Sequence, residues 1–243
     1  MSERRRIDRL LVERGLFGSR AKAQAAIEAG LVRANDVVVR KASDEIAIDA
    51  PLTATPAHPY VSRSGLKLVA ALDHFGFDPR GRVCLDVGAS TGGFTQVLLE
   101  RGARLAIAVD VGRDQLHASL RGRPDVLSLE QTDIRAVASS LLPEPPDLVT
   151  IDVSFISLNL VLPAVTQLTG PKAQLVALIK PQFEAGPGRV TKGIVRDPAV
   201  HAEVCESIRS RAGTLGCRVI GIIPSPIEGG EGNREFLLGA ERN

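Results

Sequence analysis

The chain of 243 residues has 44% hydrophobic and 24% charged residues, a balance that excludes a predominantly disordered protein. Because only 3% of the residues are aromatic and none is Trp, stacking of bases on aromatic side chains is excluded as the main mode of any nucleic-acid binding. The net charge of +2 is too small to indicate a nucleic-acid partner, so the distribution of charge matters more than its total.

The first 50 residues have the pattern of a small α+β domain. Apolar residues at helical spacing predict a helix over residues 6–15, ended by Gly15, and a second over residues 20–29, capped by Ser19. Short β-branched runs then predict strands at 31–33, 37–39 and 46–48.

Positive charge is concentrated in this first segment. Between Arg4 and Lys41 there are ten basic and four acidic residues, a net charge of +6. Basic side chains gathered on one small domain are suited to contacts with nucleic-acid phosphates. Most charge runs are only solvated surfaces, so this pattern indicates RNA binding only in combination with other signals.

A linker and a helix separate this domain from the rest of the chain. Pro51, Pro56 and Pro59 each remove a backbone donor and disfavour helix at the preceding residue, which predicts a linker over residues 51–62. Apolar residues at helical spacing then predict a helix over residues 63–75.

From residue 82 onward, short apolar runs alternate with helical stretches, which is typical of a parallel sheet covered on both faces. The predicted strands are 83–87, 105–109, 126–129, 148–151, 174–179, 218–223 and 235–239. The last two strands are connected by a glycine-rich turn and not by a helix, so we expect them to pair antiparallel. The predicted fold class is therefore α/β, with a seven-stranded, mostly parallel sheet whose last strand is antiparallel.

A turn of small residues, Gly88 to Phe94, follows the first strand of this sheet. Small residues let the backbone approach a ligand at the carboxyl edge of the sheet, beside a helix N-terminus, although ordinary tight turns have the same composition. The turn lacks the Gly-Lys-Ser/Thr ending of a P-loop and the Gly-x-Gly-x-x-Gly spacing of a dinucleotide fold. It therefore predicts a different nucleotide-like cofactor.

Carboxylates near this turn narrow the choice of cofactor. Asp110 ends the second strand, where it is placed to accept hydrogen bonds from ribose hydroxyls. Asp86 precedes the turn and Asp133 follows the third strand, which favours a cofactor with a cationic amino-acid end and an adenine. S-adenosyl-L-methionine fits this description.

Motifs spread over nearly the whole chain form a recognisable set. They are Arg6–Val12 (RIDRLLV), Ser19–Ala23 (SRAKA), Val61–Arg63 (VSR) with Lys67, Asp86–Thr95 (DVGASTGGFT), Asp152–Ser157 (DVSFIS), Lys180–Glu184 (KPQFE) and Gly232–Glu235 (GNRE). Together they resemble the TlyA (hemolysin A) family, ribosomal RNA 2′-O-methyltransferases in which an S4-like RNA-binding domain precedes an FtsJ-like methyltransferase domain.

The resemblance implies a domain organisation and partners. Residues 1–50 would form the S4-like domain, 51–62 the linker and 63–243 a Rossmann-like class I methyltransferase domain. The implied partner is ribosomal RNA or a ribosomal subunit, methylated on cytidine in 16S and/or 23S rRNA, and the implied cofactor is S-adenosyl-L-methionine. The oligomeric state is not specified. The candidate RNA-binding residues are Arg4, Arg6, Arg20, Lys22 and Arg63.

FtsJ-like enzymes use a Lys-Asp-Lys-Glu tetrad, and the matching motifs place it at Lys67, Asp152, Lys180 and Glu235. A ribose 2′-OH is too weak an acid to attack a methyl group unaided, so a base or a cationic field must draw off its proton. We expect Lys180 to be that base and Asp152 to orient it. Lys67 would add positive charge, and Glu235 would position Lys67 or the ribose. In isolation, such residues at strand ends are more often solvated charges.

The candidate cofactor-binding residues are Asp86, Gly88, Ala89, Ser90, Thr91, Gly92, Gly93, Phe94, Asp110, Asp133, Asp152 and Phe155. Among these, Phe155 has two equally weighted interpretations. It packs beside the cofactor or caps the substrate pocket, or it belongs to the hydrophobic core.

Two other classes of function compete with this interpretation. One is a non-catalytic RNA-binding protein on a methyltransferase fold, which a cofactor-binding measurement would distinguish. The other is a pore-forming haemolysin, which is disfavoured because no stretch approaches the ~18 apolar residues of a membrane span and no apolar signal core is present. We expect a cytoplasmic protein without a membrane or metal partner, and its three widely spaced cysteines predict reduced thiols.

Overall fold

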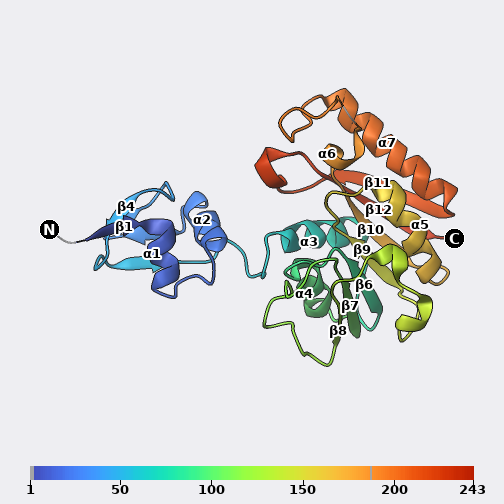
Figure 1. Cartoon of the computed structure of the whole chain (residues 1–243), viewed down its shortest axis with the longest axis horizontal. Helices are drawn as coiled ribbons and strands as arrows, with labels where there is room; N and C mark the ends of the chain where they lie inside the picture. Colours follow the sequence, from blue (N-terminus) through green and yellow to red (C-terminus); the bar gives the residue numbers. More distant parts are fainter. Residues whose placement is uncertain (1–2, 187) are drawn as a thin grey trace. The chain divides into compact units, whose positions relative to one another are not determined.

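The structure is a computed structural model that describes residues 3–186 and 188–243 of the chain. The chain divides between Pro59 and Tyr60 into two compact units (Figure 1). Each unit has a hydrophobic core of its own. The first unit carries the basic segment, and the second carries the turn of small residues and the proposed tetrad.

The first unit packs two helices against short strands. The helices are α1 (Ile7–Glu13) and α2 (Arg20–Glu28), and the strands are β1 (Arg4–Arg6), β2 (Val32–Ala34), β3 (Val37–Val38), β4 (Glu45–Ala47) and β5 (Leu52–Ala54). β1 pairs antiparallel with β4, and β2 lies between β3 and β5. Ile7, Leu11 and Ile27 of the helices are buried in the core. The Ser19 hydroxyl accepts a hydrogen bond from the Lys22 N–H and caps α2, as predicted.

Two strands of this unit, β1 and β5, differ from the sequence-based prediction. β1 consists of three arginines, which lack the alternation of apolar and polar residues that identifies a strand, and backbone pairing with β4 defines it. β5 lies inside the predicted linker over residues 51–62, yet Leu52 pairs with Ala34 of β2. Pro51 permits this strand because it stands ahead of it, where no N–H is needed for the ladder. The first unit therefore extends past residue 50.

The second unit is built on a seven-stranded sheet. Its strands are β6 (Val83–Val87), β7 (Leu105–Val109), β8 (Val126–Leu129), β9 (Leu148–Ile151), β10 (Gln174–Ile179), β11 (Cys217–Pro224) and β12 (Phe236–Arg242). Their spatial order is β11-β12-β10-β9-β6-β7-β8. β12 runs antiparallel to both of its neighbours, and the pairs from β10 to β8 are parallel. The predicted fold class and the antiparallel last strand are confirmed.

Helices cover both faces of this sheet. They are α3 (Ser64–Phe75), α4 (Gly93–Glu100), α5 (Leu158–Leu168), α6 (Pro181–Glu184) and α7 (Pro198–Thr214), with short 3-10 turns at Ile134–Ala136, Ser139–Leu141 and Gly230–Gly232. Cys84 of β6 packs in the cluster formed with α3 and α4, whereas Leu85 packs in the cluster formed with α5 and α7. Side chains of a strand alternate between faces, so burial of both faces explains the continuous apolar runs.

The functional candidates gather at one edge of the sheet because of this topology. Gly88, Asp110, Asp152 and Lys180 each directly follow a parallel strand, and carboxyl ends of parallel strands share an edge. Glu235 precedes β12, and since β12 is antiparallel, its start lies at the same edge. Side chains distant in the sequence are thereby brought near one another.

Candidate active site

Two turns at the carboxyl edge of the sheet approach each other through their backbones. Gly88 has a φ of +81°, and a Cβ there would lie 2.4 Å from the carbonyl oxygen of Asp152. Only glycine combines this φ with this closeness. The Asp152 N–H donates to the carbonyl of Val87 over 2.9 Å, which fixes the end of β9 against the end of β6. The turn of small residues and Asp152 therefore lie side by side.

A large cavity of about 790 Å³ is hollowed beside these turns. The predicted cofactor-binding residues that line it are Gly88, Ser90, Asp110, Asp133, Asp152 and Phe155. Its volume lies within the range of sites that enclose nucleotide-sized ligands. The close-packed glycine turn, acidic groups at the ends of β7 and β8, and this volume fit the S-adenosylmethionine that the sequence predicts.

Both of those carboxylates are held in place. Asp110 accepts hydrogen bonds from the N–H groups of Ser90 and Gly112, each at 2.7 Å. Asp133 binds the guanidinium of Arg135 at 2.6 Å, and this interaction lowers the pKa of the Asp133 carboxyl. Each carboxylate is therefore fixed at the cavity wall by its partners.

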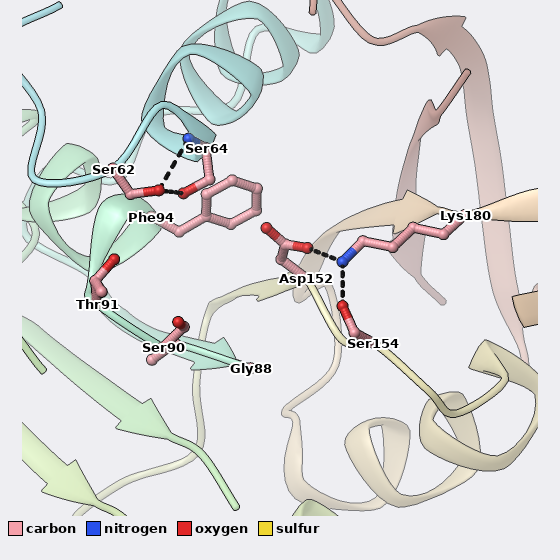
Figure 2. A pocket seen from close by; sticks show the side chains of 10 residues that line it. Ser62, Ser64, Gly88, Ser90, Thr91, Phe94, Asp152, Ser154 and Lys180 are labelled. Atoms are coloured by element: carbon pink, nitrogen blue, oxygen red, sulfur yellow. Dashed lines mark hydrogen bonds and ion pairs between the residues drawn. The ribbon is translucent and has the colours of Figure 1, made fainter. Parts of the chain in front are cut away.

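A small pocket of about 170 Å³ adjoins the large cavity, and the two share Gly88, Ser90, Asp152 and Ser154. Figure 2 shows Asp152, Ser154 and Lys180 on one side of the small pocket and the side chains at the start of α3 on the other. The remaining lining residues are Ser62, Ser64, Ala89, Thr91 and Phe94. Hydroxyl groups and one Lys–Asp pair thus surround a space large enough for part of a nucleotide.

Gly92 and Gly93 serve the packing of the turn and do not line either cavity. Gly92 has a φ of +92°, and a Cβ on Gly93 would lie 2.2 Å from the Ser64 hydroxyl oxygen. The missing side chain of Gly93 allows the start of α4 to approach the start of α3, whereas that of Gly92 makes room for Leu116 and Leu120. They shape the small pocket indirectly.

Lys180 and Asp152 form an ion pair in the wall of the small pocket. Lys180 Nζ lies 2.6 Å from Asp152 Oδ1 and donates a hydrogen bond to Ser154 Oγ at 2.8 Å (Figure 2). The two charged side chains are only 10% and 15% exposed, so water screens their attraction weakly. The structure brings these two tetrad members together, as the sequence predicts.

Lys67 and Glu235 form a second ion pair, of 2.5 Å, that is more deeply buried. Neither residue lines the small pocket or the large cavity. Phe236 of β12 pairs with Ile179 of β10 in antiparallel register. Glu235, just before Phe236, and Lys180, just after Ile179, therefore lie at the same edge of the sheet. The four predicted catalytic residues therefore form two ion pairs, and one of these pairs lines the small pocket.

Asp86, predicted to bind the cofactor, is fully buried inside the sheet and does not line either cavity. Its carboxylate accepts hydrogen bonds from the hydroxyls of Thr95 at 2.6 Å and Thr150 at 3.0 Å. Burial raises the pKa of Asp86 to about 7, and the charge of Asp152 acts in the same direction. The Asp86 carboxylate is thus directed at Thr95 of α4 and Thr150 of β9, and it does not reach the wall of either cavity.

Phe155 does not belong to the core. Its side chain is 91% exposed, its φ is +63°, and it lines the large cavity. Its ring centroid lies 5.0 Å from that of Phe183, a residue of the short helix α6 that begins just after Lys180. A positive φ is strained for an aromatic residue, so the turn at residue 155 is held by its surroundings.

Four of the predicted RNA-binding residues lie in the first unit and Arg63 lies in the second. Arg6 and Arg20 both bind the fully buried carboxylate of Asp8, at 3.1 and 2.7 Å, and these contacts hold the pKa of Asp8 well below its usual range. The two guanidinium groups remain 41% and 50% exposed, so they are anchored yet accessible. Of the others, Arg4 and Arg63 are exposed and Lys22 is partly buried.

Ser154 and Asp8 make contacts that the sequence analysis does not single out. Ser154 carries no signal, because a serine in a loop is ordinary. Asp8 does carry one: it stands between Ile7 and Leu10 near the start of an amphipathic helix, where a buried carboxylate needs partners. The nearby arginines could have been assigned to it.

Within residues 3–186 and 188–243, no helix is long and apolar enough to cross a membrane. In the same residues, no group of three or more His, Cys, Asp or Glu side chains is arranged to hold a metal ion. The three cysteines are free, with Cys84 and Cys217 buried and Cys205 partly buried.

Comparisons with known proteins agree with this geometry. The family model of FtsJ-like methyltransferases matches residues 60–242, and that of the S4 domain matches residues 5–49. The chain is 43% identical to the Mycobacterium tuberculosis protein named 16S/23S rRNA (cytidine-2′-O)-methyltransferase TlyA, over 98% of this chain and 90% of that relative. It is 39% identical to the Campylobacter jejuni protein named 23S rRNA (cytidine-2′-O)-methyltransferase TlyA, over 73% of this chain and 69% of that relative.

A solved structure from Streptococcus thermophilus, which carries a hemolysin name, matches with a TM-score of 0.80 and 41% identity. The match covers 100% of this chain and 90% of that one. The likeness thus extends over both units of the chain and does not depend on a single motif.

Proposed function

This chain belongs to the TlyA family of FtsJ-like methyltransferases, as its motifs predict, and we propose that it transfers a methyl group from S-adenosylmethionine to a ribose 2′-OH of ribosomal RNA. The observation that carries this proposal is the Lys180–Asp152 pair, which stands in the wall of a small pocket adjoining a nucleotide-sized cavity. A base and a cofactor site at one place are what the reaction requires.

When bound, S-adenosylmethionine supplies a methyl group on a positively charged sulfur, which is a good leaving group. We assign the backbone of Gly88 to Thr91 to close contact with this cofactor and Asp110 to its ribose hydroxyls. Two backbone N–H groups already bind Asp110, and a carboxylate has room for further donors. Asp133, fixed by Arg135 in the same cavity, is the candidate for the adenine end.

Lys180 is the proposed base that takes the proton from the 2′-OH as the oxygen attacks. It accepts that proton only as the free amine, so its own ammonium proton must leave first. Asp152 holds Nζ at 2.6 Å and lines both cavities, which suits a carboxylate that orients the base and faces the reacting methyl group. Positioning of this kind is the main contribution asked of the protein.

Lys67 and Glu235 have a supporting role in this proposal. Their charges compensate each other within a buried pair, so Lys67 contributes less positive field at the small pocket than an unpaired Lys would. The pair joins α3 to the residue preceding β12, beside Lys180. We therefore assign it to holding the site together, with no contact to substrate.

The substrate is proposed to be ribosomal RNA, with cytidine as the modified nucleotide. The S4 domain and the names of the relatives support this choice. Arg4, Arg6, Arg20, Lys22 and Arg63 are the proposed phosphate contacts. The exposed ring of Phe155, at the edge of the large cavity, is the candidate to cap the substrate pocket.

Lys180→Ala tests the assignment of the base. Ribosomal subunits and labelled S-adenosylmethionine are incubated with the wild type and the variant, and the methylated nucleotide is mapped. We expect methyl transfer to be abolished in the variant, while calorimetric cofactor affinity and RNA affinity stay near wild type. Turnover like that of the wild type would remove Lys180 from the base role. A wild-type protein that binds RNA but not the cofactor would favour the non-catalytic alternative.

Substitution of Arg4, Arg6 and Arg20 by Ala tests the RNA contacts. We expect weaker RNA binding and a smaller dependence of the binding constant on salt, because a protein that makes fewer phosphate contacts releases fewer counterions when it binds. Loss of Arg6 and Arg20 also removes both cationic partners of the buried Asp8 and leaves it only the hydrogen bond from Gln24, so the binding assays are repeated with Asp8→Ala added to restore folding. An unchanged salt slope in the folded variant would mean that these arginines do not touch phosphate.

A further inference from the structure

The Lys180 ammonium has a second acceptor besides Asp152. Its Nζ donates to Ser154 Oγ at 2.8 Å, while Asp152 Oδ1 lies at 2.6 Å (Figure 2). The Lys180 side chain is 10% exposed, so bulk water competes little with these two partners. Two protein acceptors therefore define the position of Nζ.

The two contacts also restrict the orientation of the ammonium. A lysine ammonium has three N–H donors at tetrahedral angles. The hydrogen bond to Ser154 fixes one of these three directions, and the ion pair with Asp152 limits how far Nζ can move around it. Loss of the Ser154 hydroxyl would therefore leave the nitrogen, and its lone pair once a proton has left, free to change direction. Lys180 itself lines the small pocket, so a group bound there can reach the nitrogen.

Ser154 is held firmly enough to act in this way. The Asp152 N–H binds the carbonyl of Val87, and the Leu158 N–H binds the Glu184 carboxylate at 2.8 Å, so the loop is pinned at both ends. Burial raises the pKa of Glu184, and the hydrogen bonds from Ser157 and Leu158 oppose that shift. The serine hydroxyl is thus presented to Lys180 by a fixed backbone.

We propose that Ser154 is a positioning residue that aims the Lys180 amine at the substrate hydroxyl, a role that rests on the proposed function above. Ser154 acts through Lys180 and takes no proton from the substrate. It also lies where the small pocket and the large cavity join, so a change of shape must be separated from a loss of the hydroxyl.

Ser154→Ala removes the hydroxyl, and Ser154→Thr keeps it. Both variants are measured with ribosomal subunits as substrate, and calorimetric cofactor affinity verifies that each is folded. We expect Ser154→Ala to lower kcat about tenfold or more, with KM for cofactor and RNA changed less than about threefold. A misoriented base slows the chemical step, whereas the contacts that bind cofactor and RNA are kept. Ser154→Thr should recover most of kcat.

Four outcomes would overturn the role proposed for Ser154. Wild-type kcat in Ser154→Ala, or equal losses in the Ala and Thr variants, would overturn the positioning role while leaving the proposed function intact. A fall in cofactor affinity that accounts for the whole loss of rate would assign Ser154 to cavity shape and also overturn it. Absence of methylation by the wild-type protein would overturn the proposed function and the Ser154 role with it.

Discussion

Replacing Asp86 with Asn should reduce the dependence of stability on pH. Burial raises the pKa of Asp86 from its ordinary 3.8 to about 7. The folded protein therefore keeps this proton over a range in which the unfolded chain has lost it, so rising pH favours unfolding. A shift of about 3 units corresponds to about 4 kcal/mol in full, of which about 2 to 3 kcal/mol falls between pH 5 and pH 8.

The assay is urea unfolding at pH 5, 6.5 and 8, followed by circular dichroism because the chain has no Trp. The stability of the wild type relative to Asp86→Asn should fall by about 2 to 3 kcal/mol from pH 5 to pH 8. Asp125→Asn is the matched control. Arg123 lowers the pKa of Asp125, which is ionised in both states over this range and should add no dependence on pH. Parallel pH profiles of wild type and Asp86→Asn would refute the reasoning.

Two further predictions concern the frame of the site. Gly88→Ala should lower the free energy of unfolding by at least about 2 kcal/mol and weaken cofactor binding, because the φ of Gly88 is positive and a Cβ there would press on Asp152. The control is Gly213→Ala in α7, where a Cβ would meet open space. This variant should be neutral or stabilising in the same unfolding assay. Lys67→Met should lower the free energy of unfolding by about 3 to 5 kcal/mol, because it leaves Glu235 buried and without its cationic partner. Adding Glu235→Gln to this variant should recover much of the loss. Equal urea midpoints for the single and double variants would contradict this coupling.

Much of the fold follows from local patterns in the sequence. The predicted bounds of β6 to β10 coincide with those in the structure, because strands buried on both faces are unbroken apolar runs between polar turns. β1 and β5 are different. Arg4 to Arg6 form a strand only through pairing with β4, and β5 depends on β2, which is 18 or more residues earlier in the chain. Non-local pairing overrides the local preference there.

The site was predictable where chain topology alone positions a residue. Asp152 and Lys180 follow neighbouring parallel strands, so their meeting follows from the strand order. Whether a side chain faces a cavity or the core is a different question. Asp86 lies within β6, two residues before the turn, and its carboxylate is taken by Thr95 of α4 and Thr150 of β9. The position of the Asp86 carboxylate depends on how α4 packs against the sheet, and the sequence motif around Asp86 does not specify that packing.

The two ion pairs, Lys67–Glu235 and Lys180–Asp152, have different surroundings, and this difference supports the roles that we propose for them. Lys67 and Glu235 are enclosed, so separating their charges would leave one of them in a medium of low polarity. Lys180 and Asp152 line the small pocket. When the lysine gives up its proton, the attraction within the ion pair is lost, and a polar group bound in the pocket can compensate part of that loss. A base must change its charge during the reaction, and of the two lysines only Lys180 stands where that change can be compensated. The same comparison explains why Lys67, although also a lysine of the tetrad, is better suited to stability than to proton transfer.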